Sequence, residues 1–387
     1  EAIKKVFVAK GRPQDNPLIV HISNIEMLST VAKDIPEKAI ECAKRFWPGP
    51  FTMVLKKSDN IAESVSAGLD TVAVRMPSDK TARDIIDKSG LPLAAPSANL
   101  SGSPSPTTAK HTLQDLDGRV DAVVMGGDCE VGVESTVVAL FGDTPRLLRP
   151  GAVTVEQLKE ILPDLIVDKA VLSEAKSGEK VASPGMKYKH YAPKTEAFLV
   201  EGGKLAFADF VNKQTNAAAL CFDEELDIIK IKKLSYGKQK DHKTLAQNVF
   251  TKLRDADLLG VDKIYIHAPS KNGIGLAVYN RLIRASAFNV INLNSLVVGL
   301  TGPTGSGKST ASSLVLENGI NVIDCDKLAR VAVEKGTEGL KALVDNFGNE
   351  ILNADGTLNR KALAKIAFST KEKTNLLNKT LLPHIAR

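Results

Sequence analysis

Two basic side chains, Lys10 and Arg12, are separated by a single residue near the start of the chain. Pro13 and Pro17 keep the turn that follows out of helix, and the apolar residues 18–22 predict a buried strand. A rigid turn at a strand edge can bind a polyphosphate, because arginine binds two oxygens at once and lysine adds a point charge. Such a basic pair is more often a solvated surface, so the prediction depends on residues further along the chain.

A second phosphate-binding pattern, Gly302-Pro303-Thr304-Gly305-Ser306-Gly307-Lys308-Ser309, lies in the last quarter of the chain. In a P-loop of this kind, glycines let backbone N–H groups surround the phosphates, Lys308 reaches the terminal phosphates and Ser309 binds magnesium. The apolar residues 296–301 predict the strand that must precede it, and residues 309–316 predict a helix with its N-terminus on the phosphates. The residues expected at this nucleotide are Gly305, Ser306, Gly307, Lys308, Ser309 and Thr310.

Further polar side chains stand where predicted strands end or turn, namely Asn16, Arg75, Ser97, Asn99, Ser135 and Arg149. The strands expected around them cover residues 51–56, 71–76, 92–95, 122–125 and 135–141. Residues 96–106 form a loop of Ser, Pro and Asn that offers hydroxyls, an amide and backbone N–H groups. Ligands bind at strand ends in open α/β sheets, so these side chains are candidates for one shared site.

From residue 196 onward, short apolar stretches alternate with helical patterns. Strands are expected over 197–200, 217–222, 228–234 and 263–267, and helices over 204–212, 243–259 and 273–288. Alternation of this kind predicts a parallel sheet with helices packed on it. This part has no glycine-rich phosphate loop and no carboxylate cluster, so we expect an accessory domain, and we assign no chemistry to Asn280, Arg281 or Arg284.

Composition limits the classes of protein to consider. With 387 residues the chain is too long for one core, so two or three domains are expected. A net charge of +6, with lysines spread along the chain, suits small anions and does not demand nucleic acid. The four cysteines lie far apart, which predicts neither disulfides nor a zinc site and fits a reducing cytosol. Neither a membrane span nor a signal peptide is predicted, so we expect a cytoplasmic protein without a membrane partner.

Five sequence motifs, taken in order, resemble the YrdC-like threonylcarbamoyl-AMP synthases. They are Lys10-Gly11-Arg12-Pro13 with residues 16–21, Phe46-Trp47-Pro48-Gly49-Pro50-Phe51-Thr52, Val72-Ala73-Val74-Arg75-Met76-Pro77, Pro96-Ser97-Ala98-Asn99-Leu100-Ser101-Gly102 and Glu134-Ser135-Thr136-Val137. No single motif is specific, but five in register are. Residues 183–193, Ser183-Pro184-Gly185-Met186-Lys187-Tyr188-Lys189-His190-Tyr191-Ala192-Pro193, are similar to the linker of the long, two-domain form of this family.

The resemblance implies an enzyme that joins L-threonine, bicarbonate and ATP into L-threonylcarbamoyl-AMP and releases pyrophosphate, for the threonylcarbamoyladenosine modification of tRNA. Enzymes that complete the tRNA modification are the implied downstream partners. By the family's pattern, Lys10 and Arg12 act in catalysis. ATP is implied at Arg12, Asn16, Thr71, Ser97, Asn99, Ser105, Arg149 and His190, and threonine at His21, Arg75, Ala95 and Ser135.

Residues 321–330 and 355–360, taken together with the P-loop, resemble dephospho-CoA kinase, which adds a 3′-phosphate to dephospho-CoA in the last step of coenzyme A biosynthesis. In that family the acid matching Asp326 is the base at the ribose hydroxyl. The alternative for Asp324 and Asp326 is that they cap a helix. The expected cofactor is Mg²⁺, with ATP as substrate and without zinc, flavin or NAD.

The expected architecture is α/β throughout: a YrdC-like twisted mixed sheet with helices, a small Rossmann-like α/β domain and a partial P-loop NTPase α/β domain. The expected domains are a synthase domain at 1–160, a linker at 161–195, an accessory domain at 196–293 and a kinase domain at 296–387. The first residue, Glu1, and the last, Arg387, both fall inside helical patterns, and parts of both families' folds are expected beyond them. We therefore expect each half to be incomplete.

Two other classes of protein remain open. A YrdC-type RNA-binding module without catalysis is one, because such domains carry a positive face that binds RNA weakly. The sequence has no basic strand rich in aromatic residues and no glycine-arginine tract, which argues against a dedicated RNA binder. A carbamoyltransferase built around the same domain is the other, but the zinc-finger cysteine pairs and acylphosphatase-like segment of those proteins are absent.

Overall fold

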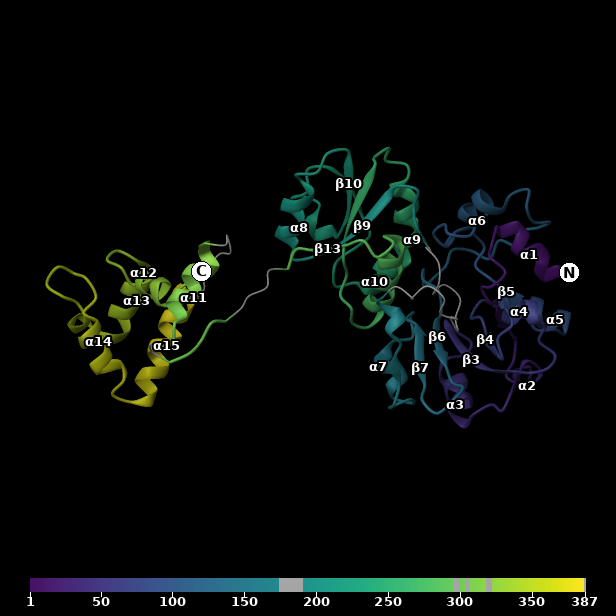
Figure 1. Ribbon diagram of the computed structural model, residues 1–387, viewed down its shortest axis with the longest axis horizontal. Coiled ribbons are helices and arrows are strands. Elements are labelled where there is room, and N and C mark those ends of the chain that lie inside the picture. Colours follow the sequence, from purple (N-terminus) through teal and green to yellow (C-terminus); the bar gives the residue numbers. More distant parts are fainter. Residues whose placement is uncertain (174–190, 295–298, 304–305, 318–321, 386–387) are drawn as a thin grey trace. The chain divides into compact units, whose positions relative to one another are not determined.

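The computed structural model describes residues 1–173, 191–294, 299–303, 306–317 and 322–385. The chain divides into two compact units, residues 1–295 and residues 296–387 (Figure 1). None of the helices among the described residues is long and apolar enough to cross a membrane.

The first unit begins with a mixed eight-stranded sheet in the order β5-β1-β4-β3-β6-β7-β8, with β2 paired to β3. Its strands are β1 (Ile19–His21), β2 (Ala32–Lys33), β3 (Phe51–Lys57), β4 (Thr71–Arg75), β5 (Leu93–Ala95), β6 (Thr136–Ala139), β7 (Arg146–Arg149) and β8 (Ile166–Val167). Its helices are α1 (Ala2–Lys10), α2 (Leu28–Val31), α3 (Glu37–Phe46), α4 (Glu63–Ser66), α5 (Lys80–Ser89), α6 (Ala109–Leu116) and α7 (Val155–Lys159), followed by the 3₁₀ turn η1 (Lys169–Val171).

The register of the central strands explains where the polar residues lie. Neighbouring strands pair His21 with Arg75, Arg75 with Thr52, Thr52 with Val137 and Val137 with Arg149. Paired residues point to the same face of a sheet, so side chains far apart in sequence form one row across it. Strands β3 and β4 lie in the middle of the sheet and are mostly buried, as central strands are.

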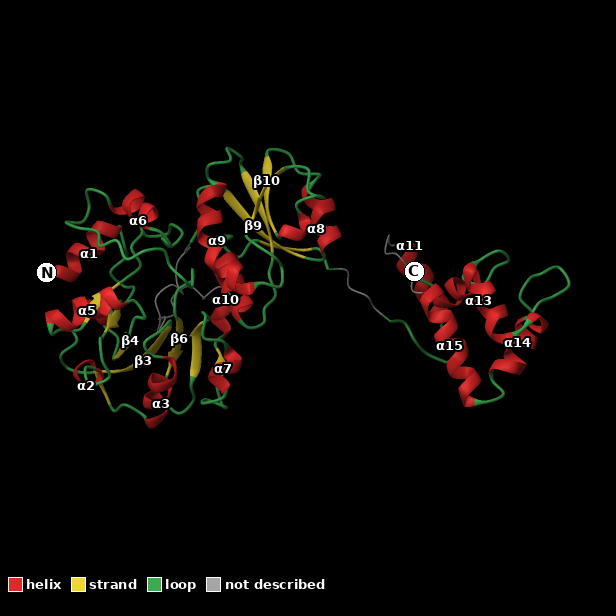
Figure 2. Ribbon diagram, turned by 180° about the vertical axis from the view of Figure 1, so that it is seen from behind, coloured by secondary structure: helices red, strands yellow, loops and turns green. Residues whose placement is uncertain are grey.

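A second sheet of five parallel strands follows in the order β11-β10-β12-β9-β13. Its strands are β9 (Glu196–Glu201), β10 (Ala217–Cys221), β11 (Lys232–Ser235), β12 (Lys263–His267) and β13 (Val290–Asn292). Its helices are α8 (Lys204–Val211), α9 (His242–Ala256) and α10 (Ile274–Ala285), with the 3₁₀ turn η2 (Asp223–Glu225). Helices α9 and α10 lie side by side (Figure 2). The predicted parallel sheet with packed helices is confirmed.

One predicted strand of the first unit is not observed. Residues 122–125 form no strand, and Val124 and Met125 are exposed, because an apolar stretch becomes a strand only where a neighbour completes its hydrogen bonds. The sequence interpretation also missed β8 (Ile166–Val167), which lies within the predicted linker and adds to the first sheet beside β7. A strand of two residues is too short to show a periodic pattern in the sequence.

The described part of the second unit is helical, with α11 (Lys308–Glu317), α12 (Cys325–Val331), α13 (Glu338–Phe347), η3 (Asn349–Ile351), α14 (Arg360–Ala367) and α15 (Lys371–Ile385). The predicted α/β architecture of this unit is therefore not observed. Residues 299–301 and 322–323 are not strands, and 296–298 and 321 lie outside the described residues. A parallel strand requires a paired neighbour, and the described residues of this unit supply only an isolated bridge between Leu352 and Leu358.

Candidate functional site

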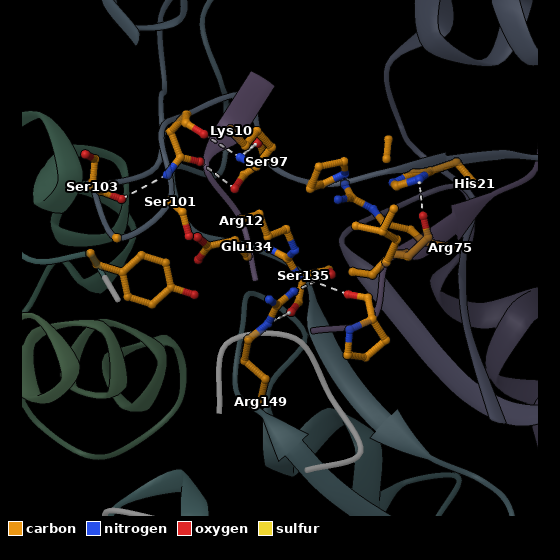
Figure 3. A pocket seen from close by; sticks show the side chains of 18 residues that line it. Lys10, Arg12, His21, Arg75, Ser97, Ser101, Ser103, Glu134, Ser135 and Arg149 are labelled. Atoms are coloured by element: carbon orange, nitrogen blue, oxygen red, sulfur yellow. Dashed lines mark hydrogen bonds between the residues drawn. The ribbon is translucent and has the colours of Figure 1, made fainter. Parts of the chain in front are cut away.

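A cavity lies beside this row of paired residues, between the sheet and the loop after β5, and it is lined by His21 and Arg75 from one end of the row and by Arg149 from the other (Figure 3). Basic side chains come from four places: the end of α1, the turn after it, the end of β4 and the end of β7. The residues lining the cavity are Lys10, Arg12, Pro17, Leu18, Ile19, His21, Arg75, Ala95, Pro96, Ser97, Asn99, Ser101, Gly102, Ser103, Glu134, Ser135, Arg149 and Tyr191.

Lys10 is the last residue of α1, and the turn predicted to carry it begins only at Gly11, whose φ of +59° ends the helix. Its side chain is buried and its ammonium donates to the carbonyl oxygens of Ser97 and Asn99. Burial and then the charge of Arg12 lower the pKa of Lys10 to about 8, against the opposing effect of Asp115. Lys10 therefore both holds the loop after β5 and places a positive charge at the cavity.

Arg12 lies in the turn itself and donates to the carbonyl of Pro17 at 3.0 Å and to that of Asn16 at 3.4 Å. Burial is the main cause that lowers its pKa to about 10, and the nearby charge of Arg149 adds to the effect. The guanidinium remains charged at neutral pH. These short-range contacts orient it toward the cavity without joining it to another element.

Arg149 connects β7 to the start of β6. Its Nε donates to the carbonyl oxygen of Ser135 at 3.0 Å, and its terminal nitrogen donates to the Ser135 hydroxyl at 3.1 Å. The same hydroxyl lies 2.7 Å from Oγ1 of Thr52 on β3. Burial lowers the pKa of Arg149, and Arg281 lowers it further, while Tyr191 and Glu134 oppose the shift. Three strands thus fix Ser135 and Arg149 in one place.

His21 and Arg75 occupy the other end of the cavity (Figure 3). Burial, and then Arg75, lowers the pKa of His21 to about 4, so its imidazole is neutral at pH 7 and Nδ1 donates to the Ile19 carbonyl at 3.1 Å. Arg75 donates from Nε to the Gly49 carbonyl at 3.1 Å, and burial, then Arg149, lowers its pKa to about 10. The permanent charge at this end is therefore that of Arg75.

The loop after β5 is held by its own side chains. The Ser97 hydroxyl donates to Oδ1 of Asn99 at 2.6 Å, and the Asn99 amide donates to the carbonyls of Leu100 and Ser103 at 2.8 and 3.0 Å. Asn99 is buried, and its amide donates hydrogen bonds within the loop, so this side chain has a structural role. The backbone of this loop is consequently ordered before any ligand is bound.

Three predicted site residues do not line the cavity. Thr71 is at the opposite end of β4 from Arg75, about 13 Å away along a strand, so the prediction that places it at the nucleotide is not supported here. Asn16 is buried, and its carbonyl accepts a hydrogen bond from Arg12. Ser105 donates to Glu134. His190 lies outside the described residues.

The sequence interpretation missed three residues that the fold adds. Thr52 supports Ser135, Tyr191 lines the cavity, and Glu134 is the acid of its wall. Burial acts to raise the pKa of Glu134, but Arg281, Arg149 and the Ser105 hydroxyl outweigh it and lower the pKa. Glu134 and Tyr191 both belong to motifs that were recognised, but nothing in those motifs indicated which side chains would face the ligand.

The P-loop of the second unit is described except for residues 304 and 305, so the predicted Gly305 lies outside the described residues. The ammonium of Lys308 donates to the carbonyls of Gly302 and Pro303 at 2.6 and 2.7 Å. Ser306, Gly307, Ser309 and Thr310 are exposed around the start of α11.

Of the two acids, Asp324 caps α12 by accepting from the backbone N–H groups of Asp326 and Lys327 at 3.0 and 3.1 Å. The helix-capping alternative therefore holds for Asp324. Asp326 lies exposed in the first turn.

Two protein-family models match the first unit. The Sua5/YciO/YrdC family model, described as "Telomere recombination", matches residues 1–151, and the model of the threonylcarbamoyl-AMP synthase C-terminal domain matches residues 153–287. The threonylcarbamoyl-AMP synthase of Pyrococcus abyssi is 43% identical over 299 residues, covering 76% of this chain and 86% of that protein. The chain belongs to the threonylcarbamoyl-AMP synthases.

Other synthases support the assignment. The Bacillus subtilis enzyme is 42% identical over 297 residues, covering 75% of this chain and 85% of that protein. The crystal structure of P. abyssi Sua5 complexed with L-threonine superimposes with a TM-score of 0.68 at 40% identity, and covers 75% of this chain and 86% of that chain. Both sheets of the first unit are thus parts of one synthase.

The synthase is followed by a dephospho-CoA kinase region, since that family's model matches residues 296–387. The dephospho-CoA kinase of Pseudoalteromonas translucida is 50% identical over 99 residues, and that of Listeria monocytogenes is 53% identical over 88 residues. These matches cover 47% and 44% of the kinases, so the chain spans about half their length.

Proposed function

We propose that the cavity of the synthase binds ATP at its Lys10 end and L-threonine at its Arg75 end, and joins them through a carbamate. The observation that carries this proposal is the convergence of Lys10, Arg12, Arg75 and Arg149 on one cavity with a single acidic neighbour among its lining residues. Burial is the main cause that lowers the pKa values of Lys10, Arg12 and Arg75, and in each case a neighbouring arginine lowers the pKa further. An anionic ligand would offset both the burial cost and the repulsion between these charges.

The proposed reaction follows from that charge pattern. The threonine amine and bicarbonate form a carbamate and water, and a carbamate oxygen attacks the α-phosphorus while pyrophosphate leaves. Positioning and charge neutralisation are the main requirements of such a step. Arg12 and Arg149 would neutralise the phosphates, Arg75 would bind the threonine carboxylate, and Ser135 lies between the two ends with its hydroxyl held by Thr52.

Magnesium is the metal that this reaction implies, and the lining of the cavity provides few ligands for it. Both oxygens of Glu134 are occupied, by Ser105 and Arg281, and the described residues contain no group of three potential metal ligands. The ion would therefore be bound by the triphosphate, as Mg²⁺ commonly is. We place the reaction in the cytoplasm, where unpaired cysteines such as the buried Cys42 and Cys221 are stable.

Product analysis tests the proposed reaction. With ATP, threonine and bicarbonate, mass spectrometry should detect threonylcarbamoyl-AMP together with pyrophosphate. Replacing Arg75 by alanine should raise the KM for threonine about 10- to 100-fold, because a hydrogen-bonded charge contributes about 1.5–3 kcal/mol. The KM for ATP should change much less. Arg146→Ala is the control, since Arg146 lies at the far end of β7 and is exposed. A larger effect on ATP than on threonine would reverse the assignment of the two ends.

The lowered pKa of Lys10 predicts that ATP binding depends on pH. Its pKa of about 8 in the free protein means that the ammonium loses its proton between pH 7.5 and 9, and a neutral amine attracts phosphates less. ATP affinity should fall up to tenfold per pH unit above pH 8, as measured by calorimetry, and Lys10→Arg should remove this dependence. Because the folded pKa lies below the unfolded value, the free energy of unfolding without ligand should rise between pH 8 and 10.5. An ATP affinity that is constant from pH 7.5 to 9.5 would contradict a role for Lys10 at the phosphates.

We propose that the kinase region binds a nucleotide through Lys308, with Ser309 as the magnesium ligand and Asp326 near the acceptor hydroxyl of dephospho-CoA. The support is local: Lys308 bridges the carbonyls of the loop, and the hydroxyl of Ser309 is exposed in the first turn of α11. RNA binding by the first unit is the remaining alternative to catalysis, and a steep loss of affinity for tRNA with rising salt would favour it.

A further inference from the structure

Arg281, on α10 of the second sheet, extends into the first sheet of the synthase. Its side chain is fully buried. Nε donates to a carboxylate oxygen of Glu134 at 2.8 Å, one terminal nitrogen donates to the Glu134 carbonyl at 3.1 Å, and the other donates to the Pro150 carbonyl at 2.6 Å. One guanidinium therefore holds the two segments that carry Ser135 and Arg149, because Ser135 follows Glu134 and Arg149 precedes Pro150.

Glu134 is the acidic residue in the cavity wall, beside Ser135 and Arg149 (Figure 3). Its second carboxylate oxygen accepts a hydrogen bond from the hydroxyl of Ser105. With both oxygens occupied, the carboxylate is balanced by a guanidinium that does not line the cavity. The guanidinium of Arg149 instead donates to Ser135.

Removal of the Arg281 charge would leave a buried carboxylate without its main partner. Such a group is costly in a low-dielectric site, and it pairs with whatever cation it can reach. The nearest alternatives are the cations proposed to bind the triphosphate. An uncompensated Glu134 would therefore compete with ATP for Arg149 and would also repel the phosphates.

We propose that Arg281 is a positioning residue of the synthase: it neutralises Glu134 from the second sheet and so keeps the cavity's cations available for the triphosphate. The accessory sheet then completes the nucleotide site without contacting the nucleotide. This inference rests on the proposed ATP site.

The test compares charge with packing at position 281. Arg281→Gln keeps hydrogen-bonding capacity without charge, and it should raise the KM for ATP at least tenfold, more than it lowers kcat. Arg281→Lys keeps the charge and should raise the KM for ATP less than threefold. The double variant Arg281→Gln/Glu134→Gln removes both charges and should return the KM to within threefold of the original chain.

Arg284→Met is the matched control. Arg284 lies on the same helix and donates to the Ala170 carbonyl at 2.8 Å, so its loss also weakens the contact between the two sheets. The KM of the Arg284→Met variant for ATP should stay within twofold of that of the original chain. An equal rise in KM for Arg284→Met, a tenfold rise for Arg281→Lys, or a folded double variant as impaired as Arg281→Gln would overturn the inference. If Arg12→Ala leaves the KM for ATP unchanged, the proposed nucleotide site itself is wrong; if only Arg281→Gln has no effect, the site stands and this inference fails.

Discussion

Replacement of Arg12 by alanine should lower kcat/KM for threonylcarbamoyl-AMP formation by about 10²- to 10³-fold. The charge that develops as pyrophosphate leaves needs fixed positive partners, and removal of one such donor in other enzymes costs about 2.7–4 kcal/mol. Folding should change little, because the side-chain hydrogen bonds of Arg12 within the described residues go to the carbonyls of its own turn, at Asn16 and Pro17, and such bonds contribute about 1 kcal/mol. Steady-state kinetics and thermal unfolding of the same sample separate the two effects.

Arg83 provides a matched control for this experiment. Like Arg12 it donates to carbonyls of a nearby turn, those of Pro77 and Ser78 at 2.7 and 2.6 Å, but it does not line the cavity. Arg83→Ala should therefore cost similar stability and leave kcat/KM within about threefold of the original chain. Equal losses of activity in the two variants would show that Arg12 acts through the fold of its turn.

In the kinase region, Lys308→Ala should abolish magnesium-dependent ATP binding. Lys308 is placed to exchange its bonds to the carbonyls of Gly302 and Pro303 for phosphate oxygens, and the helix N-terminus at α11 alone attracts an anion weakly. Binding should be measured in the full chain with Arg12→Ala present, so that the synthase cavity does not contribute. Even with Lys308 intact, we expect weak binding and no phosphorylation of dephospho-CoA, because Ser306, Gly307 and Ser309 are exposed and phosphoryl transfer needs shielding from water.

Lys335→Ala is the control for Lys308, since Lys335 is also exposed and donates to a backbone carbonyl, that of Asp355 at 2.7 Å. It should leave nucleotide affinity unchanged. Formation of coenzyme A by the chain, lost on Asp326→Asn, would contradict the expectation that this region binds without catalysis.

The sequence was sufficient for the two families and for most of the polar side chains that the fold brings to one cavity. Lys10, Arg12, Arg75, Ser97, Ser135 and Arg149 were identified at strand ends or turns, and all of them line the cavity. Such positions are readable because an apolar stretch that stops at a polar residue marks both the strand and its end. The P-loop was equally clear, since glycines, lysine and serine at fixed spacing have one common use.

Local sequence patterns did not determine which apolar stretches would pair with a neighbouring strand. Residues 122–125 and 299–301 are apolar enough for strands, yet neither stretch is one, because a strand depends on hydrogen bonds to another strand. Thr71 shows the same limit for a site residue, since its distance from the cavity depends on which end of β4 faces it.

The role of the second sheet was also beyond the sequence. Arg281 was noted and given no chemistry, because an arginine in a helical pattern looks the same whether it faces water or a carboxylate of another sheet. What the sequence by itself determined was the two families, most strands of the first unit and the basic residues at the ends of helices, turns and strands. Only the tertiary structure placed Glu134 and Arg281 together, 147 residues apart in the chain, because burial and charge pairing are properties of the packed molecule.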